Sequence, residues 1–166
     1  MEIIEPIYIP SHEVSNWHSI RDQAEELAKL VDATNVFAIH HMQVSEKPLN
    51  FFVLKPEVLG PVIDELGSRF IINPVVVKLF PQFYKMKEGC ASFPHKAHKN
   101  VLRSPIVTVK YQIPDSKGEL VEKTMEVQGL VAQIFQHEID HGHGKNIYYE
   151  HPKPIHPRVS EPAEEK

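Results

Sequence analysis

The sequence predicts an α+β fold in which a mostly antiparallel sheet, in one or more layers, packs around a central helix. Two stretches have apolar residues at helical spacing, and short β-prone runs separated by Pro, Gly and Asn lie between them. The 166 residues, of which 42% are apolar, suffice for one domain with a hydrophobic core. We therefore predict a single domain over residues 1–149.

The two predicted helices cover residues 16–32 and 127–143. In the first, apolar residues recur at steps of three and four residues from Trp17 to Val31, with polar residues between them. The second has a broader apolar face, which predicts a helix packed into the middle of the domain. That face is made by Leu130, Val131, Ile134, Phe135 and Ile139.

Strands are predicted in the β-prone runs at 51–54, 70–72, 75–79, 106–113 and 120–127. A cluster of turn residues at 114–118 separates the last two runs. We expect these two strands to pair as a hairpin.

The ends and the charge of the chain exclude several functions. Residues 150–166 mix prolines with charged residues, which predicts a disordered tail. The N-terminal residues contain no apolar run long enough for a signal peptide or a membrane span, so we expect a cytoplasmic protein without a membrane partner. The formal net charge of −4 offers no basic surplus for direct nucleic-acid binding. Four lysines are interpreted as solvated surface: Lys85, Lys87, Lys96 and Lys99.

The second predicted helix carries His137, Glu138 and His141, a His-Glu-x-x-His pattern. A four-residue step places the two imidazoles one turn apart on one helix face, so that both can reach one ion. Glu138 can then point toward water in an open coordination position. The alternative is two surface histidines, but the apolar surroundings favour a metal site because enclosed polar groups need partners.

Cys90 is the single cysteine, which forbids an internal disulfide. The composition of the chain leaves three alternatives for Cys90: a small buried hydrophobic residue, a reactive thiol or a metal ligand. A hydrolytic metal site that keeps one position for water needs a third protein ligand besides the two histidines.

Two segments resemble motifs of the peptide deformylase family. Residues 88–92, Glu-Gly-Cys-Ala-Ser, resemble its EGCLS motif, and residues 136–141, Gln-His-Glu-Ile-Asp-His, resemble its QHExDH motif. The order and separation of the motifs also fit, and the similarity extends from about residue 70 to residue 141. The chain is thus identified as a divergent, short-tailed member of this family, and the resemblance makes residues 1–149 a catalytic domain.

The resemblance implies that Cys90, His137 and His141 bind one divalent ion. The ion is expected to be Fe²⁺, which the family generally uses, and Zn²⁺ would fit the same ligands by geometry. It implies hydrolytic removal of the N-formyl group from N-formylmethionine of newly synthesised polypeptides, with Glu138 as acid and base. Transient contact with the ribosome stays open, because the proline-rich tail replaces the long C-terminal helix of some bacterial members.

The resemblance also assigns groups that touch the substrate. The side-chain amide of Gln43 and the backbone N–H of Ala91 would donate to the oxyanion. The side chain of the substrate's first residue needs an apolar pocket, for which Leu130, Ile134 and Ala38 are the candidates.

The family's third motif, GxGxAAxQ, is altered in residues 36–43, where only Gln43 keeps its place. His40 and His41 replace two alanines, and we assign them no role beyond packing or exposure. Gly142 replaces the leucine that usually follows the last histidine. Asp140 has two interpretations, a solvated helix residue or an acceptor that orients an imidazole.

Two other functions remain to be tested against deformylation. His-Glu-x-x-His helices also serve amidases and metalloproteases, although the cysteine motif argues against a protease. The altered segment 36–43 motivates a degenerate domain that binds peptides without turnover.

Overall fold

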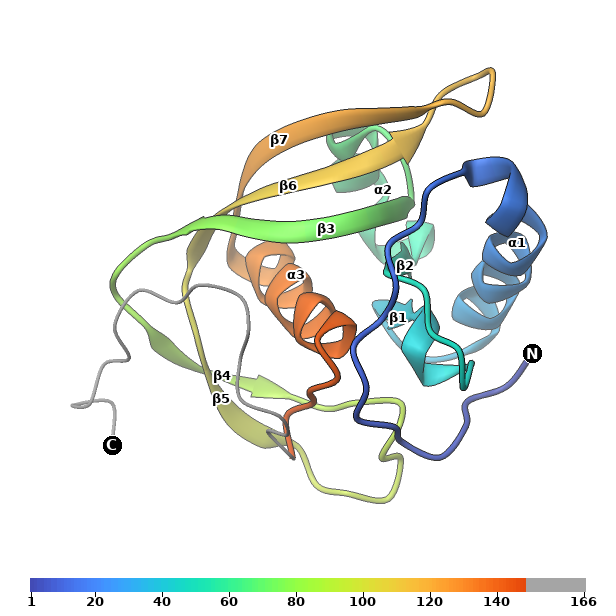
Figure 1. The fold of residues 1–166 in the computed structure, drawn as a ribbon. Helices are drawn as coiled ribbons and strands as arrows, with labels where there is room; N and C mark the ends of the chain where they lie inside the picture. The colour runs from blue at the N-terminus through green and yellow to red at the C-terminus, as the bar shows by residue number, and fades with distance from the viewer. Residues whose placement is uncertain (149–166) are drawn as a thin grey trace.

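The computed structural model describes residues 1–148 and has the predicted α+β class (Figure 1). The helices are α1 (Trp17–Ala33), α2 (Pro56–Leu66) and α3 (Gly129–Gly142), with a 3₁₀ turn η1 (His41–Gln43). The strands are β1 (Ala38–His40), β2 (Phe51–Leu54), β3 (Phe70–Leu79), β4 (Tyr84–Glu88), β5 (Lys99–Arg103), β6 (Ile106–Pro114) and β7 (Leu120–Gln128).

The strands form one five-stranded sheet and one separate pair. The sheet has the order β1-β2-β3-β6-β7, all neighbours are antiparallel, and β4 pairs with β5. The predicted hairpin of β6 and β7 is confirmed, with a register that runs from Ile106 opposite Gln128 to Pro114 opposite Leu120. In Figure 1, α3 lies between this hairpin and the β4-β5 pair.

The sheet has a hydrophobic core on each face, because successive side chains of a strand point to opposite faces. On β2, Phe52 belongs to the core that includes Phe135 and Ile139 of α3. Phe51 and Val53 belong to the other core, which includes the apolar stripe of α1. Both predicted helices therefore pack on the sheet through their apolar faces. The prediction is wrong for Leu130 of α3, which is 42% exposed because it lies in the first turn of the helix, outside the core.

The two runs predicted at 70–72 and 75–79 form one strand, β3, with an irregularity at Asn73. Asn73 has φ of 50°, a left-handed conformation that asparagine tolerates better than most residues. Its side chain bonds to the backbone N–H and C=O of Val14 and to Gln112 Oε1, at 2.7–2.8 Å. These bonds attach the N-terminal segment at Val14 to β3 and connect β3 with β6 through Gln112.

Several elements were not predicted. Helix α2 contains Gly60 and Pro61 and is non-helical at Leu59, and these residues hide its apolar pattern. Strand β1 was missed because it has only three residues, and β4 and β5 were missed because their lysines weaken the β-prone pattern. The prediction that α3 starts at residue 127 is wrong, because Val127 and Gln128 end β7.

Two predictions concern the chain as a whole. The single domain over residues 1–149 stays a prediction, and the proposed disordered tail at 150–166 lies outside the described residues. Among residues 1–148, no helix is both long and apolar enough to cross a membrane.

Candidate metal centre

Helix α3 places His137 and His141 one turn apart, as their spacing predicts. Their Nε2 atoms lie 3.1 Å apart, and the two ring centroids are 4.8 Å apart. Gly142 follows His141 and ends the helix. Both imidazoles therefore present a nitrogen to the same point beside the helix.

Cys90 lies just beyond the end of β4, and the Cys90 Sγ atom is 3.5 Å from Nε2 of His141. The candidate ligand atoms of Cys90, His137 and His141 all lie within 4.8 Å of one another. The structure thus brings together the three residues that the sequence predicts as ligands. One sulfur and two imidazole nitrogens form a donor set that fits a divalent transition metal, with room for a fourth ligand.

Two side chains at this cluster, Glu138 and His141, each contain a buried polar atom that makes no hydrogen bond within the described residues. These atoms are Oε1 of Glu138 and Nδ1 of His141. Burial lowers the pKa of His141 well below its usual range, with a further contribution from His137. A neutral imidazole is the form that binds a metal.

Glu138 lies on α3 beside the candidate ligands and is almost fully buried. Burial favours the neutral acid and raises the pKa of Glu138 to about 7, from the usual 4.5. A carboxyl group with such a pKa can both accept and donate a proton near neutral pH.

Glu88 is the first residue of the Glu-Gly-Cys-Ala-Ser motif, and no role was predicted for its side chain from the sequence. Its Oε1 lies 2.7 Å from Nδ1 of His137, which orients that ring. Arg103 donates from Nε and Nη2 to the two oxygens of Glu88, each at 2.8 Å. Burial opposes the charge of Glu88, but hydrogen bonds from Arg103 and His137 outweigh burial and lower the pKa of Glu88 to about 2.

The buried cation Arg103 joins two acidic residues from different elements. The Arg103 side chain is 2% exposed, and Nη1 donates to Oδ2 of Asp140 at 2.8 Å. Nζ of Lys145 lies 3.5 Å from Oδ1 of Asp140. The interpretation of Asp140 as a solvated residue is wrong, because it is buried. Asp140 accepts a hydrogen bond from Arg103, whereas Glu88 is the acceptor that orients the ring of His137.

Gln43 approaches the cluster from the 3₁₀ turn η1. Its Nε2 lies 3.7 Å from Sγ of Cys90 and donates to Oγ of Ser92 at 3.0 Å. Its Oε1 accepts from the backbone N–H of His40 at 2.9 Å. This bond fixes the amide so that its N–H groups face the cluster.

His40 is buried, and it orients Gln43. Nδ1 of His40 accepts from the backbone N–H of Met42 at 3.0 Å, which completes a capping box with Gln43. Because Nδ1 accepts, the proton of the neutral ring is on Nε2, which lies 3.3 Å from Oδ1 of Asn50. A Cβ at Gly142 would lie 2.7 Å from Asn50 Oδ1 and 3.3 Å from His40 Nε2, so the small residue makes room for the histidine.

His41 is also buried, and its side chain contacts Leu49 and Phe51. Its Nδ1 accepts from the backbone N–H of Leu49 at 2.9 Å, and its ring stacks on Phe51 with centroids 4.8 Å apart. The sequence left packing and exposure open for His40 and His41, and the structure buries both.

Burial lowers the pKa of His41 to about 4 in the folded chain, from 6.5. Below pH 6.5 the unfolded chain therefore binds a proton that the folded chain does not, and stability falls until the pH reaches about 4. We expect this residue to cost ~2 kcal/mol of unfolding free energy between about pH 7.5 and about pH 5.

Urea denaturation of the metal-free protein at both pH values checks this prediction. His41→Asn keeps an acceptor oxygen in place of Nδ1 but cannot titrate. Its loss of stability on acidification should be smaller than the wild-type loss by ~2 kcal/mol. An equal loss for both proteins contradicts the assignment.

A cavity of about 480 Å³ opens beside the cluster. All the residues that the sequence predicted to touch the substrate line this cavity: Gln43, Ala91, Leu130, Ile134 and Ala38. Leu130 is 42% exposed, whereas Ile134 is buried and also belongs to the core. Glu138 and two of the candidate ligands, Cys90 and His137, line the same cavity. An apolar cavity that ends at a metal donor set and a carboxyl group has the parts that amide hydrolysis needs.

The fold and this donor set define an α+β protein with a candidate metal centre on a His-Glu-x-x-His helix. The family model for polypeptide deformylase matches residues 5–157. The chain therefore belongs to the polypeptide deformylase family.

Similar proteins fall in the same family. The peptide deformylase of Thermotoga maritima is 40% identical over 78 residues, which is 47% of this chain and 44% of the relative. That of Wolbachia pipientis wMel is 36% identical over 78 residues, 47% of this chain and 41% of the relative. The chain thus spans less than half the length of these curated relatives.

Solved structures are similar over more of the chain. The crystal structure of the Thermotoga maritima enzyme matches with a TM-score of 0.69 and 25% identity, over 89% of this chain and 96% of that one. A peptide deformylase from Plasmodium falciparum matches with a TM-score of 0.72 and 25% identity, over 87% and 83%.

Proposed function

We propose that this chain is a metal-dependent hydrolase that removes the N-formyl group from N-formylmethionine of newly synthesised polypeptides. The observation that carries the proposal is the convergence of Cys90, His137 and His141 within 4.8 Å, at a cavity that Glu138 also lines. Family membership supports the same reaction.

The proposed cofactor is one divalent ion held by Cys90, His137 and His141. Fe²⁺ suits the thiolate-containing set and the family resemblance, and Zn²⁺ fits the same ligands. When bound, the ion supplies Lewis acidity, which polarises the formyl carbonyl and makes water a stronger acid.

Glu138 moves the proton in the proposed reaction. Its carboxylate accepts a proton from the water whose oxygen attacks the formyl carbon. The same proton then goes to the peptide nitrogen as the C–N bond breaks, so that formate and a free amine leave. The raised pKa of Glu138 suits both halves of this transfer.

Gln43 and Ala91 are proposed to bind the oxygen of the formyl group as negative charge grows on it. Nε2 of Gln43 is held close to Cys90 Sγ, and Ala91 lines the cavity next to Cys90. Loss of one such donor commonly costs ~10² to 10³ in rate.

The contact between His40 and Gln43 leads to a kinetic prediction. His40→Ala removes the side chain that caps η1, so the amide of Gln43 loses part of its orientation. We expect kcat to fall about tenfold with little change in KM, because an oxyanion donor acts mainly in the transition state.

His40→Asn is the matched variant, since asparagine is a good capping residue. It should recover most of the lost kcat in assays with a formyl-Met peptide. Equal kcat values for wild type and His40→Ala would show that the cap does not serve Gln43.

The methionine side chain of the substrate is proposed to enter the apolar part of the cavity, between Leu130, Ile134 and Ala38. The proposed partners are nascent formylated chains in the cytoplasm, with transient contact to the ribosome and without direct nucleic-acid or membrane binding.

A single assay separates this function from its alternatives. Anaerobically purified protein is incubated with a formyl-Met tripeptide, and formate and free amine are measured. Release of both supports deformylation. Metal and peptide binding without turnover supports a peptide-binding domain, and cleavage inside an unformylated peptide supports a metalloprotease.

A further inference from the structure

Helix α3 places a polar side chain among the apolar ones that line the cavity. The lining residues up to the first candidate histidine share one helix face, at steps of three and four residues: Leu130, Gln133, Ile134 and His137. Leu130 and Ile134 are apolar, whereas Gln133 carries an amide. The proposed methionine pocket, which Leu130 and Ile134 help to form, therefore has a polar group in its wall.

The neighbouring strand holds the amide of Gln133. Its Nε2 donates to the carbonyl oxygen of Lys87 on β4 at 3.1 Å. The next residue of β4 is Glu88, whose Oε1 lies 2.7 Å from Nδ1 of His137, so β4 also contacts α3 one turn further along. Gln133 precedes the candidate ligand His137 by four residues, or ~6 Å along the helix axis.

The amide of Gln133 keeps a donor that the protein does not use. Its bond to Lys87 takes one of the two N–H groups of Nε2. Within residues 1–148, this bond is the only hydrogen bond of the Gln133 side chain. Gln133 is partly buried and Leu130 is 42% exposed, so this part of the pocket borders on water.

The first side chain of the substrate has the length to reach this donor. With the formyl carbonyl at the metal centre, the methionine side chain runs beside Ile134 toward Leu130, as proposed above. An extended methionine side chain is about as long as one helical turn, ~5.4 Å. That length is close to the separation of Gln133 and His137 along α3, so the end of the side chain lies beside the amide.

Methionine sulfoxide is the derivative of methionine that needs such a donor. Oxidation of the thioether adds an oxygen to the sulfur and makes the side chain polar and chiral. Burial of that oxygen without a partner is unfavourable, and a hydrogen bond from an amide offsets the cost. A thioether sulfur is only a weak acceptor, so the same amide contributes little to the binding of methionine.

We propose that the pocket accepts methionine sulfoxide as well as methionine, with Nε2 of Gln133 donating to the sulfoxide oxygen. Formylated chains whose first methionine has been oxidised then belong to the substrates of this site. The inference rests on the proposed function and widens its substrate class. The reaction is the same hydrolysis of the formyl C–N bond, and the sulfoxide leaves unchanged with the free amine.

The test compares amide-capped formyl-Met-Ala-Ser with its two sulfoxide epimers and with the norleucine peptide, in which a methylene replaces the sulfur. We expect kcat/KM for one epimer to lie within about threefold of the methionine value, and the other epimer to be about fivefold slower, because a fixed donor fits one configuration better. The norleucine peptide should match methionine within about twofold, since the thioether gains little from the amide.

Substitutions of Gln133 assign the sulfoxide contact to its amide. Gln133→Leu removes the donor, and Gln133→Glu keeps the size but offers only acceptors when ionised. Each should lower the sulfoxide-to-methionine ratio of kcat/KM about tenfold. Lys87→Met keeps the carbonyl that binds Gln133 and removes an ammonium group that also lines the cavity, so the ratio should not change.

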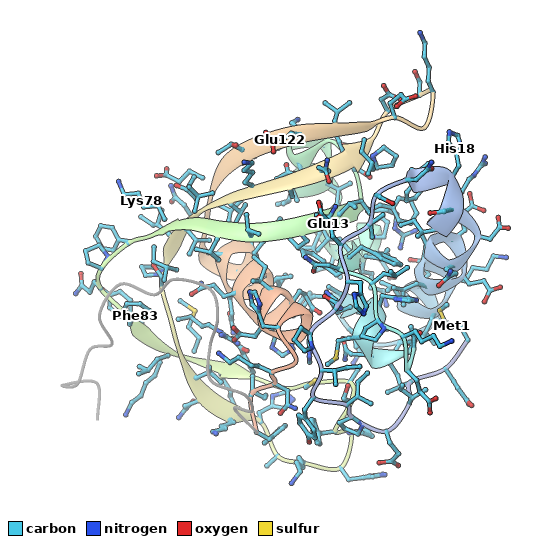
Figure 2. All side chains as sticks on the ribbon, viewed as in Figure 1. Met1, Glu13, His18, Lys78, Phe83 and Glu122 are labelled. Atoms are coloured by element: carbon cyan, nitrogen blue, oxygen red, sulfur yellow. The ribbon has the colours of Figure 1, made fainter. Side chains whose placement is uncertain are left out.

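Gln23→Leu is the matched control for the loss of a glutamine. Gln23 is an exposed residue of α1 that does not line the cavity. Figure 2 shows α1, which carries the labelled His18, apart from both α3 and β4. The sulfoxide-to-methionine ratio of this variant should equal that of the wild type.

Failure of this inference is distinct from failure of the proposed function. The inference is wrong, and deformylation stands, if both epimers are more than about tenfold slower than methionine, or if the ratio survives both Gln133 substitutions or falls in Lys87→Met. If no peptide turns over, deformylation is wrong, and fluorescence anisotropy then measures the affinity of the metal-loaded protein for labelled peptides. An equal effect of Gln133→Leu on methionine and sulfoxide affinities overturns the inference in that case too.

Discussion

Replacement of Glu138 by Gln is expected to lower kcat for a formyl-Met peptide by ~10³ or more while the bound metal is retained. The amide keeps the size of the side chain but can neither accept the proton of water nor deliver it to the leaving amine. Because Glu138 is not among the candidate ligands, metal content per chain should not change.

Steady-state kinetics and elemental analysis of the same sample check both halves of this prediction. Glu126→Gln, a substitution of an exposed residue on β7 that does not line the cavity, is the matched control and should keep wild-type kcat. A Glu138→Gln variant with near wild-type turnover would remove Glu138 from the mechanism.

Replacement of Arg103 by Met is expected to destabilise the fold by ~3 to 5 kcal/mol. The substitution removes the cation that pairs with Glu88 and Asp140, and it leaves two carboxylates buried without it. Metal affinity should also fall, because Glu88 orients the ring of His137.

Arg69→Met provides a matched control for the buried pair. Arg69 binds Asp32 through two nitrogens, as Arg103 binds Glu88, but the side chains are 20% and 51% exposed. An exposed pair contributes ~1 kcal/mol or less. Urea denaturation should separate the two variants clearly, and equal losses would show that burial of the Arg103 network does not govern its contribution.

The candidate ligands could be predicted from sequence because their spacing and motifs are local. A four-residue step on a helix determines that His137 and His141 share a face, and the resemblance of the motif around Cys90 points to the third candidate ligand. Family membership, now shown over most of the chain, agrees with that resemblance.

The residues that support the ligands could not be predicted in the same way. Glu88, Arg103 and Asp140 come from β4, β5 and α3, and no periodic pattern connects positions 15 and 37 residues apart. Their contacts depend on how the short β4-β5 pair lies beside α3. That pair was itself missed, because its lysines weaken the usual strand pattern.

The altered segment 36–43 shows a different limit of sequence reasoning. The histidines there interrupt a family motif, and sequence alone favoured packing or exposure for them over a role as additional metal or substrate groups. In the structure, a Cβ at Gly142 would clash with Oδ1 of Asn50, the partner of His40, and would lie in tight contact with the ring of His40. The two changes lie 102 residues apart in sequence and complement each other in space.

The most direct test of the proposed metal centre is X-ray absorption spectroscopy of the anaerobically purified, metal-loaded protein and of its Cys90→Ser variant. We expect one sulfur and two imidazole nitrogens around each ion, at ~2.3 Å and ~2.0 to 2.1 Å for zinc, and loss of the sulfur signal in the variant. A spectrum without sulfur in the wild type, or one unchanged by Cys90→Ser, would contradict the proposed centre.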